Sequence, residues 1–405
     1  MDQLVENQIQ TQIAPIQAIK PSLFQKIFRS NFVWFIALLL LTEAFLYYCK
    51  PLKFVHVQGA MLKDHDHVGS KISAVLANPK SNDVLTFGDS TANSLSCHAD
   101  VYTCKSRDTS ETRFVHLTSL YGQEIFKKEF GIPFTIQNLY FGGCLISDQA
   151  MMLSKLLERQ SLPKVVFLTL VPRPFIDTTV EKKISPVICY FNTRHSGLEH
   201  VKNIKDLIEY VLNSTSNIYK THSDYATVLS SLACSTFNKP INAYVASGKT
   251  GITSKNKVSI FGKEEAFDPQ AGATKEECEL EYNHYKKAYI FDQATFDYQF
   301  SQHLNMLNSL KKKGIETIVV QLPLDKTNLS LLDPKVLTMW KTSVSNAARS
   351  TDATMIDLQT DSRFDSSDFI DGIHLKGSGG VKAWQAIIEQ MKKDPALITR
   401  LKSKM

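Results

Sequence analysis

The chain has 405 residues, of which 43% are hydrophobic and 21% are charged, as in a folded protein and unlike a disordered one. Its net charge of +6 is small, and lysine and arginine are spread along the chain instead of forming a basic block. These properties give no reason to expect a nucleic-acid partner.

An apolar run stands near the N-terminus. Residues 32–48 contain only Thr42 and Glu43 as strongly polar members, and aromatic residues lie at both ends, as in membrane interfaces. The run is close to the length of about 17–25 residues that spans a membrane. A buried core helix is the alternative. No small-residue cleavage site follows the run, so a retained signal anchor over 31–49 is favoured over a cleaved signal peptide.

The charges beside this run predict its orientation. Three basic residues precede it (Lys20, Lys26 and Arg29) and two follow it (Lys50 and Lys53), a small asymmetry that favours residues 1–30 as a cytoplasmic tail and the rest of the chain as periplasmic or extracellular. Residues 50–82 are expected to form a stalk. The stalk contains the segment 63–67, Lys-Asp-His-Asp-His, which we interpret as a solvated linker because no further metal ligands stand nearby at useful spacing.

From residue 83, apolar runs typical of strands alternate with helical patterns. Strands are predicted at 84–87, 134–140, 165–171, 315–322 and 354–358, and helices at 111–130, 147–159, 283–313, 333–350 and 377–393. The alternation predicts an α/β domain over 83–393, a three-layer α/β/α flavodoxin-like fold with about five parallel strands.

Two segments of this part do not follow the alternation. Residues 176–282 are predicted to be an insertion, with helices near 200–213 and 223–234, that could cover the site. Residues 394–405 are expected to be a C-terminal tail.

Polar residues follow the first and last predicted strands, at the sheet edge where ligands bind in such folds. The first strand runs into Gly-Asp-Ser, which makes Ser90 a candidate nucleophile, and Asn93 follows as a candidate oxyanion-binding or substrate-binding residue. Asp371 and His374 come after the last strand, three positions apart, so that the carboxylate can orient the imidazole. His374 would then accept the proton of Ser90.

Two further strand ends carry candidate binding groups. Gly142 and Gly143 follow the second strand, and their N–H groups could donate to an oxyanion; a plain turn is the alternative. Arg173 stands between two prolines after the third strand and could bind an anion or an oxyanion; a surface arginine on a turn is the alternative.

Seven cysteines are present, six of them after the apolar run. Cys97 and Cys104 flank a polar loop and are the best candidate pair for a disulfide, with buried free thiols as an equal alternative. No cysteine has the spacing of a zinc site, and neither a metal nor an organic cofactor is expected.

Taken together, the Gly-Asp-Ser segment at Ser90, the Asn/Gly block at 138–143 and the Asp-Gly-Ile-His segment at 371–374 resemble the SGNH (GDSL-like) hydrolases. The resemblance covers roughly residues 83–175 and 315–393. It implies Ser90 as nucleophile, His374 as general base and Asp371 as its orienting carboxylate. It also implies that the Ser90 amide and one of the two glycines bind the oxyanion. The third block of the family supplies an asparagine where this chain has Arg173.

In layout the chain is most similar to membrane-anchored SGNH-like proteins that acetylate or deacetylate cell-surface polysaccharides. The resemblance implies a serine esterase or O-acyltransferase that acts on an ester-bearing or hydroxyl-bearing glycan of the cell envelope. A second membrane protein could supply the acyl group. The alternative from another class is a catalytically weak relative that binds glycan or assists envelope assembly.

Overall fold

The computed structural model describes the domain, an N-terminal helix and a few shorter pieces. The described residues are 31–49, 55–57, 67–77, 83–108, 113, 115–179, 187, 216, 258–260 and 266–404. The predicted helices at 200–213 and 223–234, and residues 63–66 of the Lys-Asp-His-Asp-His segment, lie outside them.

The core of the domain is a parallel sheet of five strands, as the sequence predicts. The strands are β2 (Val84–Asp89), β3 (Ile136–Phe141), β4 (Val165–Leu170), β6 (Glu316–Gln321) and β7 (Thr354–Asp357). Their order is β3-β2-β4-β6-β7, and every neighbouring pair is parallel. The chain therefore leaves β2 toward one edge and returns to the other side of it at β4. Such a reversal point is where open α/β sheets bind ligands.

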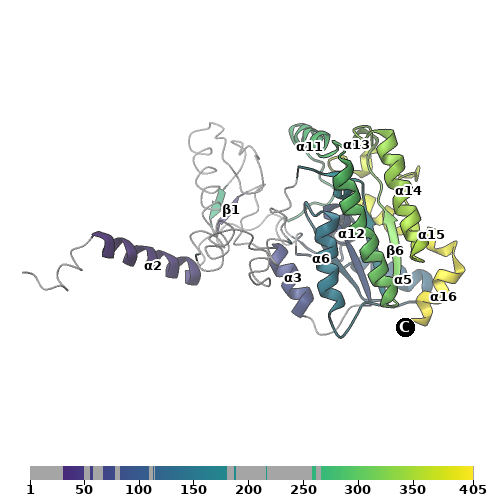
Figure 1. The fold of residues 1–405 in the computed structure, drawn as a ribbon, viewed down its shortest axis with the longest axis horizontal. Helices are drawn as coiled ribbons and strands as arrows, with labels where there is room; N and C mark the ends of the chain where they lie inside the picture. Colours follow the sequence, from purple (N-terminus) through teal and green to yellow (C-terminus); the bar gives the residue numbers. More distant parts are fainter. Residues whose placement is uncertain are drawn as a thin grey trace, which may run out of the picture.

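Helices cover both faces of the sheet, consistent with the predicted three-layer fold (Figure 1). On one face lie α4 (Cys97–Tyr102), α5 (Leu120–Phe130) and α15 (Gly377–Lys392), which pack together. On the other lie α6 (Ile146–Leu157), α12 (Gln293–Lys312) and α14 (Pro334–Ser350). Edge-to-face aromatic contacts connect the layers. Phe167 of β4 packs against Phe126 and Trp384 on one face, with ring centroids 5.9 Å apart in both pairs.

Two glycines permit close backbone approaches around the end of β2. A Cβ atom on Gly88 would lie 2.0 Å from Thr169 Oγ1 of the neighbouring strand. A Cβ atom on Gly380, in the first turn of α15, would lie 2.0 Å from the carbonyl oxygen of Ser94. The last long helix therefore packs directly on the turn that follows β2, and no larger residue fits at that contact.

Two helices differ from their predicted bounds. The predicted helix 283–313 is two helices, α11 (Lys275–Ala288) and α12, because Asp292 accepts a hydrogen bond from Thr295 N at 2.7 Å and caps a new helix. The helix predicted at 111–130 begins only at Leu120, since Thr118 forms an antiparallel bridge with Gln137.

The predicted stalk and tail both contribute to the folded domain. Within 50–82, α3 (His67–Ala77) buries Ile72 and Val75 in the main core cluster. Within 394–405, α16 (Pro395–Ser403) buries Leu397 and Leu401 in the same cluster. Both helices are short, and too few apolar positions recur in each to give a periodic signal.

The remaining elements are small. They are α7 (Arg173–Ile176), α13 (Lys326–Leu329), the 3₁₀ turns η3 (Ser90–Leu95) and η6 (Ser366–Asp368), and a two-stranded antiparallel sheet of β1 (Val55–Val57) and β5 (Val258–Ile260). The end of the predicted insertion belongs to the domain. Ala273 N donates a hydrogen bond to the carbonyl oxygen of Ile370 at 3.0 Å, and Ile370 directly precedes Asp371.

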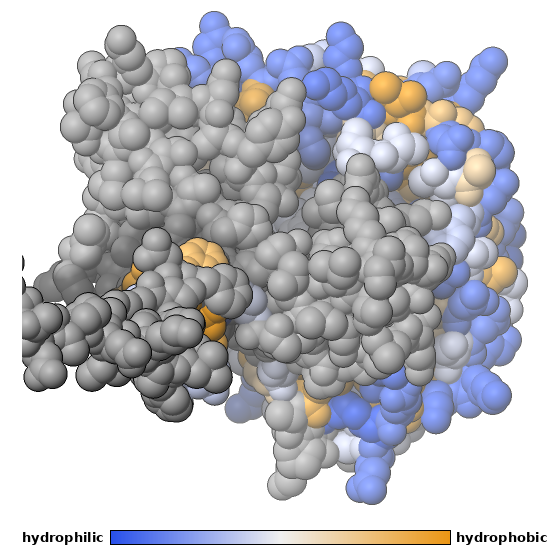
Figure 2. Space-filling model, turned by 60° about the vertical axis from the view of Figure 1, so that its left-hand side comes forward, coloured by the Kyte–Doolittle hydropathy of each residue, from blue (hydrophilic) through white to orange (hydrophobic). Residues whose placement is uncertain are grey.

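Helix α2 (Asn31–Cys49) coincides with the predicted anchor and lies apart from the sheet in Figure 1. Four of its leucines, at 38–41, are exposed, Leu38 by 64% and Leu41 by 68%. Among the residues that the structure describes, no helix is both long enough and apolar enough to cross a membrane. The anchor therefore stays a prediction. At the right of Figure 2, the surface of the described residues of the domain is mainly hydrophilic, with smaller apolar patches.

Candidate active site

Ser90, His374 and Asp371 form a continuous chain of hydrogen bonds. His374 Nε2 lies 2.9 Å from Ser90 Oγ, and His374 Nδ1 lies 2.7 Å from Asp371 Oδ2. A carboxylate only accepts, so Nδ1 carries the proton and donates to Asp371, and Nε2 is left to accept from the Ser90 hydroxyl. The structure thus brings together the three residues that the sequence selects for a nucleophile, a base and an orienting acid. Their catalytic role is a separate matter and stays a prediction.

Local structure explains why each residue is held in place. Ser90 follows β2 directly, and Asp89 fixes the turn by accepting hydrogen bonds from Thr91 N at 3.0 Å and Thr91 Oγ1 at 2.5 Å. Asp371 Oδ1 accepts from the amide of His374 at 2.9 Å, while its other oxygen holds the imidazole of the same residue. Gly372 has a φ of 93°, which suits glycine and lets the chain turn back between these two residues.

The loop that carries the pair is tied to the sheet. Ile370 N donates to His374 O at 2.7 Å, which closes a tight loop around Asp371. Asp325, just after β6, donates its N–H to Gly372 O at 3.0 Å. The loop after the edge strand β7 is therefore held toward the interior strands, and His374 can reach the end of β2.

The electrostatics suit a general base. Burial opposes a charged imidazole, but the carboxylate of Asp371 raises the pKa of His374 above its ordinary value through its charge and its hydrogen bond. Burial would likewise raise the pKa of Asp371, yet the charge of His374 and the hydrogen bonds it donates lower that pKa to about 2. Asp371 is therefore ionised over the whole physiological range, and His374 is easily protonated when Ser90 loses its proton.

Gly142 and Gly143 lie in the turn at the end of β3, the strand next to β2. Gly143 has a φ of 69°, and among the described residues, apart from the chain neighbours of each glycine, no heavy atom lies within 4 Å of a Cβ built on either residue. The described part of the chain thus leaves space beside both glycines. This is compatible with the predicted oxyanion site and does not distinguish it from a plain turn.

Arg173 is not a surface arginine on a turn. It begins α7, its side chain is 6% exposed, and its Nε atom forms an ion pair with Asp177 Oδ2 at 2.9 Å. Asp177 in turn accepts from Thr179 N at 2.8 Å through its other oxygen. Arg173 also experiences the charge of Asp89, next to Ser90, so it lies near the site. The ion pair with Asp177 is structural, and donation to an oxyanion remains a prediction.

Asn93 is buried and contacts a residue that the sequence did not single out. Its Nδ2 atom lies 3.3 Å from His98 Nε2, and His98 Nδ1 lies 2.8 Å from the carbonyl oxygen of Leu375. The carbonyl can only accept, so Nδ1 donates and Nε2 accepts from Asn93. Burial lowers the pKa of His98 to about 4, which keeps the ring neutral. His98 therefore joins η3, which begins at Ser90, to the residue after His374. A lone histidine on a short helix gives no signal of this role in the sequence.

The predicted disulfide is wrong. Cys97 and Cys104 are both free thiols, one buried and one exposed. Cys97 begins α4 and Cys104 lies two residues after α4 ends, so a helix of six residues, roughly 9 Å long, separates them by more than the Cα separation that a disulfide allows. Cys49, Cys144 and Cys278 are also free, and Cys189 and Cys234 lie outside the described residues.

Two sequence comparisons identify no relative of this chain. No protein-family model matches the chain, and no curated protein shows significant sequence similarity to it. Any family assignment therefore depends on the motifs and on the arrangement of the residues described above.

Proposed function

We propose that this protein is an SGNH-type serine esterase or O-acyltransferase with Ser90 as its nucleophile. The observation that carries the proposal is the hydrogen-bonded series from Ser90 through His374 to Asp371, with distances of 2.9 and 2.7 Å. Its position at the reversal point of a doubly wound sheet supports a ligand site there.

The reaction would follow from these contacts. His374 Nε2 takes the proton of Ser90 as Oγ attacks an ester carbonyl, and Asp371 stabilises the imidazolium that results. The proton then passes to the leaving alcohol, and an acyl group remains on Ser90. Water, or a sugar hydroxyl in a transferase, accepts the acyl group in the second half of the reaction. Amides at Ser90 and at Gly142 or Gly143 are the proposed oxyanion donors.

The proposed substrate and location depend on the resemblance in layout to membrane-anchored enzymes that modify cell-surface polysaccharides. We propose an ester-bearing or hydroxyl-bearing envelope glycan as substrate and attachment through residues 31–49. The exposed apolar side chains of α2 favour this attachment. A catalytically weak glycan-binding protein is the second candidate, favoured by the absence of an asparagine at the end of β4, where Pro172 and Arg173 stand instead.

A fluorophosphonate probe separates the two candidates, because it reacts covalently only with an activated serine. The full-length protein is expected to be labelled, with the adduct on Ser90 by peptide mapping, and Ser90→Ala is expected to abolish labelling. Ser94→Ala is the matched control, since this serine is fully buried four residues away and should leave labelling intact. A folded wild-type protein that resists labelling would favour the glycan-binding role.

A further inference from the structure

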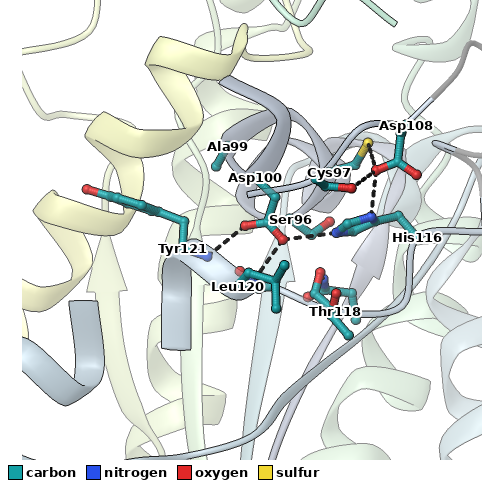
Figure 3. A network of polar contacts seen from close by, with 12 residues as sticks. Ser96, Cys97, Ala99, Asp100, Asp108, His116, Thr118, Leu120 and Tyr121 are labelled. Carbon is teal, nitrogen blue, oxygen red and sulfur yellow. Dashed lines mark hydrogen bonds and ion pairs between the residues drawn. The ribbon is translucent and has the colours of Figure 1, made fainter. Parts of the chain in front are cut away.

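A second cluster of chemically active side chains lies beside α4, outside the triad (Figure 3). It consists of Cys97 at the start of α4, Asp108 in the segment after it, and His116 just before α5. One ligand atom from each residue lies within 4.8 Å of the other two. The three residues span twenty positions in an irregular pattern, so their spacing in the sequence does not indicate a metal site.

We propose that Cys97, Asp108 and His116 bind one zinc ion, or another divalent cation with the same preference for sulfur and nitrogen. Thiolate, carboxylate and imidazole are all ligands of Zn²⁺, at about 2.0–2.3 Å. A tetrahedral site with such bonds separates its ligand atoms by roughly 3.3–3.6 Å. The separations from Asp108 Oδ2 are 2.9 Å to His116 Nδ1 and 3.7 Å to Cys97 Sγ, and all three ligand atoms lie within 4.8 Å of one another, so side-chain adjustments would bring them to this geometry.

The second nitrogen of His116 provides an independent argument. His116 Nε2 lies 3.0 Å from Asp100 Oδ2, and a metal-binding histidine usually donates its other N–H to such a carboxylate. Asp100 is itself held by the amides of Leu120 and Tyr121, each at 2.7 Å. Asp108 is supported in the same way, because Ser106 Oγ donates to Oδ2 at 2.6 Å. The candidate ligands are therefore oriented before any ion binds.

The cluster also holds negative charge that a cation would offset. The carboxylates of Asp108 and Asp100 lie 2.9 and 3.0 Å from the two ring nitrogens of His116. Zn²⁺ would bind the thiolate of Cys97 and the neutral imidazole of His116, and these two groups would release their protons to solvent on binding.

The proposed role of the ion is structural. It would join the N-terminal end of α4 to the segment that leads into α5. Helix α4 follows η3 and carries His98, so the ion would stiffen the side of the site that holds Ser90 without taking part in its chemistry. The proposal does not depend on any activity of Ser90.

Cobalt provides a direct test, because a thiolate bound to Co²⁺ gives a charge-transfer absorption that carboxylate and imidazole ligands do not. The full-length protein, stripped with a chelator and titrated with Co²⁺, is expected to bind one ion per chain with this absorption, and Zn²⁺ is expected to displace it. Cys97→Ser should abolish the absorption. Cys104→Ser, which removes the exposed thiol two residues after the end of α4, should leave it unchanged.

A variant of a supporting residue adds a graded readout. Asp100→Asn should weaken Zn²⁺ binding by about 10–100-fold, the usual effect of removing such a carboxylate, while the thiolate absorption persists at saturating Co²⁺. Co²⁺ binding by the wild-type protein without thiolate absorption would overturn the proposal and would point to the histidines of the 63–67 segment instead. The proposal would also be overturned if Cys97→Ser bound one Co²⁺ per chain with the affinity of the wild-type protein.

Discussion

His374 Nε2 lies 2.9 Å from Ser90 Oγ, although 284 positions separate the two residues in the chain. Because this contact joins the proposed base to the proposed nucleophile, its residues should act as a unit. Ser90→Ala and His374→Ala are each expected to lower kcat on an acyl ester by a factor on the order of 10⁶, and the double variant should lose little more. Steady-state kinetics with a chromogenic ester measures this. Normal turnover by Ser90→Ala would exclude the serine mechanism.

The pH dependence should report His374. The base must be neutral to accept a proton, so kcat/KM is expected to rise with pH through a midpoint above the ordinary value of 6.5 for histidine, since Asp371 raises the pKa of His374. Asp371→Asn removes the negative charge that stabilises the imidazolium, so the midpoint should move to lower pH. The same change should lower kcat by about 10⁴, because the tautomer is no longer fixed. A midpoint that stays in place would show that another group titrates.

Arg173 is expected to affect stability more than rate. Its removal leaves Asp177 Oδ2 buried without its cation, and breaking a buried pair costs about 3–5 kcal/mol. Urea unfolding of Arg173→Ala should show this loss. Lys155→Ala, which removes an exposed pair with Glu158, is the control and should cost at most about 1 kcal/mol. If Arg173→Ala unfolds normally but loses about 10²–10³ in kcat, Arg173 is instead the oxyanion donor.

His98 is expected to be a positioning residue. His98→Ala removes the link from η3 to the carbonyl of Leu375 and should lower kcat by roughly 10–10², with KM nearly unchanged. Glutamine can still donate to that carbonyl, so His98→Gln should recover part of the rate, which a merely space-filling role would not predict. An equal loss of kcat in both variants would contradict the positioning role. A variant that is less stable but has normal kcat in its folded fraction would also contradict it.

The proposed topology has its own test. Protease added to intact cells, or to spheroplasts where an outer membrane is present, should digest the domain that follows the apolar run and leave residues 1–30 protected. Removal of residues 1–49 should release the domain from the membrane fraction. Full protection of the domain until lysis would overturn the orientation.

Much of the fold could be predicted because its signals are local. The apolar runs at 84–87 and 165–171 are covered on both faces, and such strands are recognisable without knowing their neighbours. The split between α11 and α12 was missed, because the capping role of Asp292 is visible only once the chain bends there. Helices α3 and α16 were missed because they owe their place to contacts with distant parts of the core.

The candidate site likewise contains residues that the sequence predicts and contacts that it does not. Ser90, Asp371 and His374 follow strands, so the topology of a parallel sheet was enough to place them at one edge. The ion pair of Arg173 with Asp177, the link from His98 to Leu375 and the cluster around His116 depend on side-chain directions that a sequence pattern does not contain. The disulfide prediction failed because closeness in sequence does not give closeness in space when a helix separates the residues.

The close contact between Gly380 and the carbonyl oxygen of Ser94 has a consequence for how the protein matures. A chain made from its N-terminus exposes Ser90 long before His374 and α15 exist, and the turn after β2 cannot adopt its final packing until that helix arrives. A nascent or C-terminally truncated chain therefore carries a serine with no base beside it. If Ser90 is the nucleophile, the protein stays chemically silent throughout synthesis and gains reactivity only once the end of the chain has been delivered to the same compartment.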